Sequence, residues 1–225
     1  GSPINRQIIK YQKYCDLHKM PKYLIQNIDF VTMGFGYGYE RVQFFPYFFF
    51  DQELIIEIDE YENFSLMEKY VPCYRYLGYT DVITKALFNK LPYFGSIEKG
   101  YEGQVANWDG TELAKTTTIE CACDTDAVRI FIDFLSGVTL NGTKVIFVYA
   151  PIYHEVREKM INEQQMFEMY DTIAQRFNIP ILDYNDISMC YDTTYFYNGT
   201  HLNKLGAELF TTKLAHDIDS LGLLK

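Results

Sequence analysis

A histidine and an asparagine stand three positions apart near the end of the chain, in the stretch FYNGTHLNKLGAELF. His201 follows Asn198 in a polar loop just before a predicted helix. A histidine that acts as a general base needs a neighbour that accepts its Nδ1 proton and thereby fixes its tautomer. Aspartate at this spacing serves that purpose, and here asparagine occupies its place. The pair is therefore either half of a hydrolytic site, intact or degenerate, or an ordinary turn. The turn interpretation is open because Asn-Gly is a strong turn dipeptide.

The elements that must position this pair follow from hydrophobic periodicity and turn signals. The chain between about 60 and 120 is harder to assign, and we predict an irregular insertion there. Helical spacing predicts helices over 4–19, 123–138 and 155–177 and from about Lys204, and apolar runs predict strands over 28–34, 53–61, 143–151 and 179–184. Asn203 is expected to cap the last helix, and Asp124 or Thr125 the helix over 123–138.

Alternation of strands and helices over residues 123–220 predicts parallel strands joined by crossover helices. The fully apolar VIFVY fits a strand that is buried on both faces. The expected fold is a three-layer α/β/α sandwich with a mainly parallel sheet, of the flavodoxin-like kind. Ligands bind beyond the carboxyl ends of such strands. This rule brings together the loops at 34–38, 150–154 and 183–201.

Length and composition narrow the class of protein. The 225 residues suit a single domain, which we assign to residues 1–225. A net charge of -10 without any basic run argues against a nucleic-acid partner. The sequence contains no run of 18 apolar residues, so it predicts no membrane span. Gly1-Ser2 is expected to be a remnant of tag cleavage, so a native signal or anchor can have been removed.

The five cysteines are odd in number and lack metal-ligand spacing, which predicts mostly free, buried thiols. We expect no metal and no cofactor.

The stretch around His201 resembles the terminal block of SGNH (GDSL-like) hydrolases, in the bacterial form Asp-x-x-His-Leu-Asn-x-x-Gly-Ala-x-x-Phe-Thr. The stretch FVTMGFGYG is similar to the first block, a strand that runs into Gly-x-Ser, and VIFVYAPIY resembles the strand and proline turn in the middle of such members. The resemblance implies an SGNH-hydrolase fold. It also implies acyl-group removal or transfer on surface polysaccharides, in the bacterial envelope or outside the cell. A cytoplasmic location stays open.

The same resemblance implies that parts of the catalytic machinery are missing. The serine position falls on Gly36 and the aspartate position on Asn198, and only His201 matches the family triad. No asparagine follows the central strand to complete an oxyanion hole. An asparagine in place of a triad aspartate lowers turnover by about 10⁴-fold in the serine-protease example, and loss of the nucleophile removes acyl-enzyme chemistry.

Several residues are predicted to line the cleft beside this triad. They are Gly34, Tyr37, Tyr39, Trp108, Tyr153, His154 and Tyr197. Alternatives stay open for two of them: Trp108 either stacks on a sugar or is a packing lid, and His154 either lines the cleft or begins the long helix. One of Asp183, Asp186 and Asp192 is a further candidate to supply the missing carboxylate.

Two hypotheses of function follow. In the first, the chain is a degenerate SGNH-hydrolase-like protein that binds a surface glycan, an acylated ligand or a partner protein without catalysis. In the alternative, it is an active esterase or acyltransferase on envelope polysaccharide that uses His201 with a nonstandard nucleophile or water.

Overall fold

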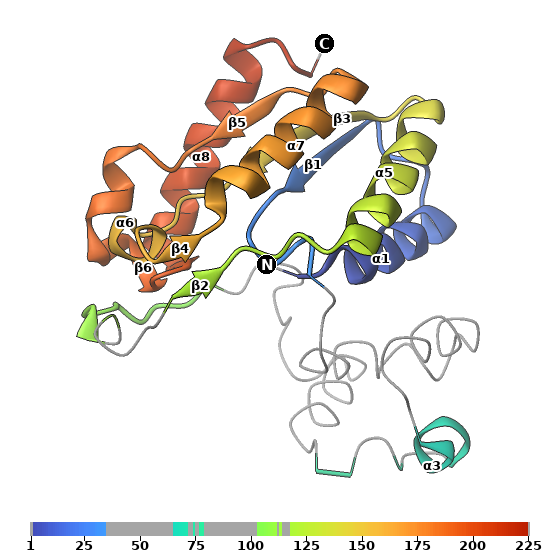
Figure 1. Ribbon diagram of the computed structural model, residues 1–225, viewed down its shortest axis with the longest axis horizontal. Coiled ribbons are helices and arrows are strands. Elements are labelled where there is room, and N and C mark those ends of the chain that lie inside the picture. Colours follow the sequence, from blue (N-terminus) through green and yellow to red (C-terminus); the bar gives the residue numbers. More distant parts are fainter. Residues whose placement is uncertain are drawn as a thin grey trace, which may run out of the picture. The chain divides into compact units, whose positions relative to one another are not determined.

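The computed structural model describes residues 2–34, 65–71, 74, 77–78, 103–111, 113 and 118–224 (Figure 1). Contacts divide the chain into two compact units, Gly1–Phe35 with Gly103–Lys225, and Gly36–Glu102. In the second unit the described part includes the short helix α3, Leu66–Tyr70. A capping box stabilises its start, because Ser65 and Glu68 bond each other's backbone N–H groups. The predicted strand over 53–61 lies outside the described residues.

The first unit is built on a parallel sheet. Its strands are β1 (Tyr23–Asn27), β3 (Lys144–Tyr149) and β5 (Ile181–Asp183), in the order β1-β3-β5. The register pairs Asn27 with Val148 and Tyr149 with Asp183, so the carboxyl ends of the three strands lie at one edge. The predicted mainly parallel sheet is therefore confirmed within the described residues.

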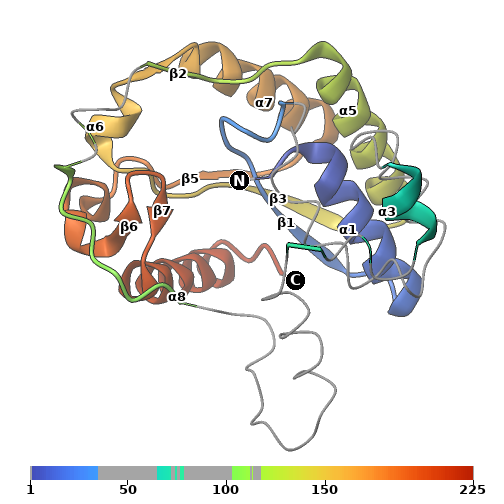
Figure 2. The same cartoon turned by 90° about the horizontal axis from the view of Figure 1, so that it is seen from below.

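Helices cover both faces of this sheet (Figure 2). Val145, Phe147 and Tyr149 of β3 share a buried cluster with residues of α5 (Thr125–Leu140) and α7 (Glu163–Phe177). Ile146 and Val148 face the other way, toward Ile218 of α8 (Lys204–Ser220). Alternation along the strand thus separates two apolar layers. α1 (Ile4–Leu17) packs beside α5, with the Tyr11 and Phe134 rings 5.2 Å apart.

Two of the predicted helix starts are confirmed by their caps. The Asp124 side chain accepts hydrogen bonds from the backbone N–H groups of Asp126 and Ala127 and begins α5. The Asn203 side chain accepts one from Gly206 N–H and begins α8. Helical spacing also predicts that Leu205, Phe210, Leu214 and Ile218 face inward on this helix, and this is wrong for Leu205, which is 52% exposed.

The predicted strand over 28–34 is wrong, because β1 ends at Asn27 and residues 30–33 form a turn. Asp29 explains the stop. Its Oδ1 accepts hydrogen bonds from Val31 N–H and Thr32 N–H, at 2.9 and 2.8 Å. A short side chain that bonds the next backbone amides competes with a sheet ladder for those amides.

The single helix predicted over 155–177 is also wrong. The chain instead forms α6 (His154–Arg157), the short strand β4 (Met160–Ile161) and then α7. The break falls at Asn162, whose φ of 63° is left-handed. Asparagine tolerates this conformation better than most residues. β4 pairs in parallel with β2 (Ile119–Glu120), and this pairing uses the residues that would otherwise continue the helix.

The chain after β5 carries short elements before α8. They are the 3-10 helices η4 (Ser188–Tyr191) and η5 (Thr193–Tyr195) and the strands β6 (Phe196–Asn198) and β7 (His201–Leu202). Among the described residues, no helix is both long enough and apolar enough to cross a bilayer.

Candidate functional site

His201 lies at the start of β7, directly across a tight hairpin from Asn198. The strands β6 and β7 are antiparallel, and their register places Asn198 opposite His201. His201 Nδ1 is 2.9 Å from Asn198 Oδ1 and 3.0 Å from Thr200 Oγ1. Two residues predicted as a triad remnant therefore touch, in the arrangement that orients a catalytic imidazole.

Asn198 Oδ1 is the centre of this hairpin. It accepts hydrogen bonds from Thr200 N–H at 3.0 Å and from the Thr200 hydroxyl at 3.2 Å. These bonds make an Asx turn, so the turn interpretation of Asn-Gly is confirmed together with the contact to His201. Asn198 Oδ1 thus both stabilises the turn and contacts His201 Nδ1.

Gly199 fixes the hairpin against the protein interior. A Cβ built on Gly199 would overlap Cγ2 of Val156 and would lie 3.1 Å from Cη2 of Trp108. Its carbonyl oxygen accepts a hydrogen bond from Tyr153 N–H at 3.0 Å. The absence of a side chain at Gly199 therefore brings the loop of His201 into close contact with the loop after β3.

A buried asparagine joins the loops that follow β3 and β5. Asn185 is 2% exposed, and its Oδ1 accepts a hydrogen bond from Ile152 N–H at 2.9 Å. Its Nδ2 donates to the carbonyl of Ala150 and to Asp183 Oδ1. These contacts confirm that the loops at 150–154 and 183–201 lie together, as strand topology predicts.

Asp29 is a residue near this site that sequence reasoning missed. It follows β1 and is 7% exposed. Partial desolvation of the imidazole lowers the pKa of His201, although the residue keeps exposed surface, and the Asp29 carboxylate acts in the opposite direction. The Asp29 carboxylate at the end of β1 therefore acts electrostatically on the hairpin of His201. Only the fold reveals this, because 172 positions separate the two residues in the sequence.

The predicted cleft residues have different environments. Trp108 is 8% exposed, and its ring lies edge-on to Tyr153 with centroids 5.1 Å apart. It therefore packs beneath the hairpin, as the lid interpretation expects, and presents little surface to a sugar. Tyr153 is also buried, whereas Tyr197 of β6 is 43% exposed.

His154 begins the short helix α6. Its Nδ1 lies 3.3 Å from the carbonyl oxygen of Cys190, and its ring packs against Tyr153 and Tyr191. None of these contacts is with His201. Gly34 packs against Ala122, with 3.2 Å between its built Cβ and the alanine Cβ. The remaining predicted residues Gly36, Tyr37 and Tyr39 lie outside the described part of the chain.

The three loop aspartates have partners other than His201. Asp183 accepts from Asn185, and Asp186 pairs with Arg157 at 3.2 Å. Asp192 accepts hydrogen bonds from Thr194, which lower the pKa of its carboxyl. Within the described residues, none of the three supplies a carboxylate to the imidazole.

A second polar network lies at the carboxyl end of β3. Glu163 Oε1 accepts a hydrogen bond from the Tyr149 hydroxyl at 2.9 Å and pairs with Arg157 Nε at 2.7 Å. Burial and the Glu163 charge raise the pKa of the tyrosine hydroxyl, so it stays a donor. The network ties α6 and α7 to the sheet next to the loop that contacts Gly199.

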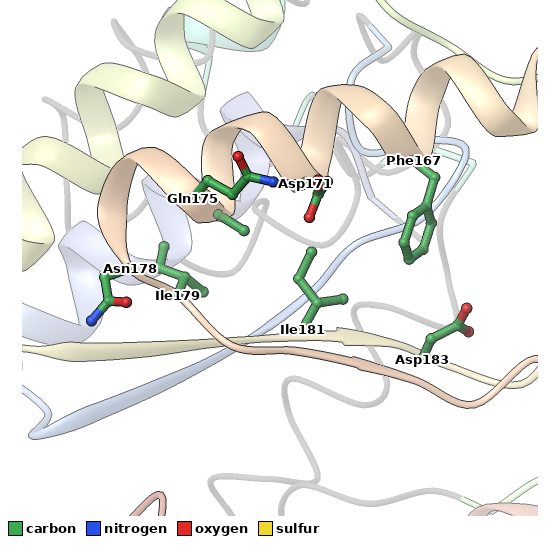
Figure 3. Close-up of a pocket in the computed structure, with 8 residues that line it drawn as sticks. Phe167, Asp171, Gln175, Asn178, Ile179, Ile181 and Asp183 are labelled. Carbon is green, nitrogen blue, oxygen red and sulfur yellow. Dashed lines mark hydrogen bonds between the residues drawn. The ribbon is translucent and has the colours of Figure 1, made fainter.

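One open groove with a volume of about 400 Å³ lies between α7 and the strand β5. Figure 3 shows Phe167, Asp171 and Gln175 of α7 above Ile181 and Asp183. None of its lining residues belongs to the hairpin of His201. In the described part of the chain, His, Cys, Asp and Glu form no group suited to a metal ion. Cys15, Cys121, Cys123 and Cys190 are free thiols, as predicted. Their expected burial holds for Cys121 and Cys190, but Cys123 is exposed and Cys15 is only partly buried.

Comparison of the chain with protein-family models, with curated proteins and with solved structures gave no match.

Proposed function

We propose that this chain is an SGNH-hydrolase-like protein of the bacterial envelope or exterior that binds a glycan, an acylated ligand or a partner at the hairpin of His201, without catalysis. The observation that carries the proposal is the contact between His201 Nδ1 and Asn198 Oδ1 at 2.9 Å. It has the geometry that holds a catalytic imidazole, at the sheet edge where α/β proteins bind ligands. The acid is absent, because the partner is an amide.

The choice of binding over catalysis rests on what surrounds the imidazole. Among the described residues, no serine or cysteine side chain is hydrogen-bonded to His201. Acyl-enzyme chemistry requires a nucleophile within about 3 Å of the base. The Asn185 side chain spends its hydrogen-bonding groups on Ile152, Ala150 and Asp183, so it is not a free oxyanion donor.

A direct test measures binding and turnover on the same preparations. A partly acetylated oligosaccharide should shift the backbone amide NMR signals of residues 196–203. His201→Ala should abolish these shifts, whereas His216→Ala, at a side chain that is 80% exposed on α8, should leave them unchanged. No hydrolysis of p-nitrophenyl acetate and no labelling by a fluorophosphonate probe are expected. Robust labelling, or shifts centred elsewhere, would contradict the proposal.

A second function has one observation in its favour. The Nδ1 contact leaves Nε2 as the ring nitrogen that can face a reactant, as a general base requires. In an ester hydrolase of this kind, Nε2 would take a proton from water as the water oxygen attacks the ester carbonyl. The acyl–oxygen bond would then break, and the leaving alkoxide would take that proton back. This alternative predicts ester hydrolysis that His201→Ala abolishes and His216→Ala preserves.

A further inference from the structure

An asparagine can present either its oxygen or its NH₂ group to a neighbouring imidazole, and the two orientations have opposite consequences. An oxygen accepts from a protonated Nδ1, whereas an NH₂ group donates to an unprotonated Nδ1. The two orientations cannot be told apart from the shape of the side chain alone. The surrounding hydrogen bonds must decide between them.

At this hairpin the backbone decides. Thr200 N–H lies 3.0 Å from the atom of Asn198 that also faces His201, and a backbone N–H is only a donor. If the amide were flipped, its NH₂ group would face this N–H, and two donors would oppose each other. The oxygen therefore occupies the shared position, and the side-chain orientation of Asn198 follows from the turn itself.

The imidazole tautomer follows in turn. His201 Nδ1 lies 2.9 Å from Asn198 Oδ1, and an unprotonated nitrogen at that distance would oppose lone pair to lone pair. A protonated Nδ1 instead donates to Oδ1, and also to Thr200 Oγ1 at 3.0 Å, whose own proton goes to Oδ1 at 3.2 Å. All three groups are satisfied in one arrangement. In neutral His201 the proton is then on Nδ1, and Nε2 is an acceptor.

The electrostatic surroundings restrict what can bind to that acceptor. An unprotonated Nε2 presents a lone pair, which repels the lone pairs of an anion. The net charge of -10 on the whole chain also disfavours an anion. Because Asn198 is an amide, the side chain hydrogen-bonded to Nδ1 supplies no negative charge that would stabilise an imidazolium. An uncharged ligand with a hydroxyl donor fits these conditions, whereas a carboxylate or phosphate does not.

We infer that Asn198 and Thr200 lock His201 in the Nδ1–H tautomer and that Nε2 accepts a hydrogen bond from a hydroxyl of a neutral, polyhydroxylated ligand. This inference rests on the proposed function and specifies its ligand. It assigns Asn198 as the positioning residue, oriented by the backbone N–H of Thr200, and it places the donor on the ligand rather than on the protein.

Long-range ¹H–¹⁵N NMR of the imidazoles tests the tautomer. The chain has four histidines, so His201→Ala identifies the signals of His201. At a pH where His201 is neutral, Nδ1 should show the shift of a protonated nitrogen and Nε2 that of an unprotonated one. Thr200→Val should retain this pattern, because it keeps the backbone N–H, and Asn198→Ala should lose it. A proton on Nε2 in the unsubstituted chain would overturn the inference.

Titration with methyl α-D-glucopyranoside, acetate and inorganic phosphate at constant ionic strength tests the ligand class. The glucoside should shift the Nε2 resonance of His201, and the two anions should not. Equal or larger shifts with the anions would overturn the inference. If the glucoside moves the amides of residues 196–203 without moving Nε2, the inference fails and the proposed function stands. If neither neutral nor acetylated sugars move those amides, the inference fails, and so does the proposed binding of a glycan or an acylated ligand.

Discussion

Gly199 and Val156 are in contact so close that the glycine has no room for a side chain. A Cβ at residue 199 would overlap Cγ2 of the valine. The φ of Gly199 is not in the left-handed region, so space rather than backbone conformation demands glycine here. The hairpin that carries His201 therefore packs directly on α6, and its stability depends on the contact between Gly199 and Val156.

Gly199→Ala should lower the free energy of unfolding by about 1–3 kcal/mol, the usual cost of overpacking a filled site. Val156→Ala in the same chain should recover part of the loss, because it removes the overlapping methyl group. Urea denaturation of both single variants and the double variant measures this coupling. Trp108, the sole tryptophan, lies 3.1 Å from the built Cβ and reports on the hairpin by fluorescence.

Gly137 on α5 is the matched control for this prediction. Its built Cβ meets nothing within 4 Å, and it lies inside a helix. Gly137→Ala should therefore stabilise the protein by about 0.5–1 kcal/mol through helix propensity. Equal effects of the two glycine substitutions would refute the packing argument.

The pKa of His201 should lie below that of an unperturbed histidine, about 6.5, because desolvation lowers it. As the pH falls below the pKa of the unfolded state, His201 then binds fewer protons in the folded state than in the unfolded state. His201 contributes full stability above the unfolded pKa and loses it as the pH falls through the folded pKa. Imidazole ¹H shifts followed from pH 8 to 5 measure the titration, and Asn198→Asp should raise the pKa. A midpoint above that of the urea-unfolded chain would contradict the prediction.

Asn203 should be more important than an ordinary helix cap, where substitution by alanine costs about 1 kcal/mol. It is 3% exposed, accepts from Gly206 N–H and donates through Nδ2 to the carbonyl of Thr194 at 2.7 Å. Asn203→Ala leaves the Thr194 carbonyl without this donor and should cost about 2–3 kcal/mol in all. Asn203→Asp keeps the cap but places an acceptor-only carboxylate oxygen opposite the Thr194 carbonyl oxygen in a buried position, so thermal unfolding should rank it no higher than the alanine variant.

Tyr149→Phe should lower the free energy of unfolding by about 1.5–3 kcal/mol, as expected for a hydrogen bond to a charged group. The hydroxyl is lost while the buried ring remains, and among the described residues the Glu163 carboxylate then keeps Arg157 as its one partner. Tyr191→Phe removes the same group from a side chain that is 58% exposed and should change stability by less than about 0.5 kcal/mol. Chemical denaturation compares the two variants, and similar losses would show that the Glu163 network contributes little.

The sequence predicts the parts of this fold that local chemistry decides. The strand β3 and the start of α5 can be predicted, because the apolar run and the Asp124 cap lie within the elements that they indicate. The end of β1 cannot be predicted, because the residues IDFVTM are typical of a strand, whereas the Asp29 side chain accepts hydrogen bonds from the next backbone amides. The break before α7 depends on one left-handed residue, Asn162, within an unbroken helical pattern.

The candidate site divides in the same way. The spacing of Asn198 and His201 predicts their contact, because a tight turn joins them. The environment of the pair could not be predicted. The influence of Asp29 and the packing of Trp108 and Val156 on Gly199 come from distant segments. Whether the asparagine faces the imidazole with oxygen or nitrogen depends on one backbone amide, which no sequence pattern encodes.

The hairpin also has an evolutionary reading. Residue 199 is confined to glycine by its neighbours, but residue 198 needs only an oxygen that faces Thr200 and His201. Aspartate offers the same oxygen. Every asparagine codon becomes an aspartate codon when its first base changes from A to G. The hairpin is therefore a single nucleotide substitution away from a charged carboxylate–imidazole pair, on a backbone that requires no rebuilding.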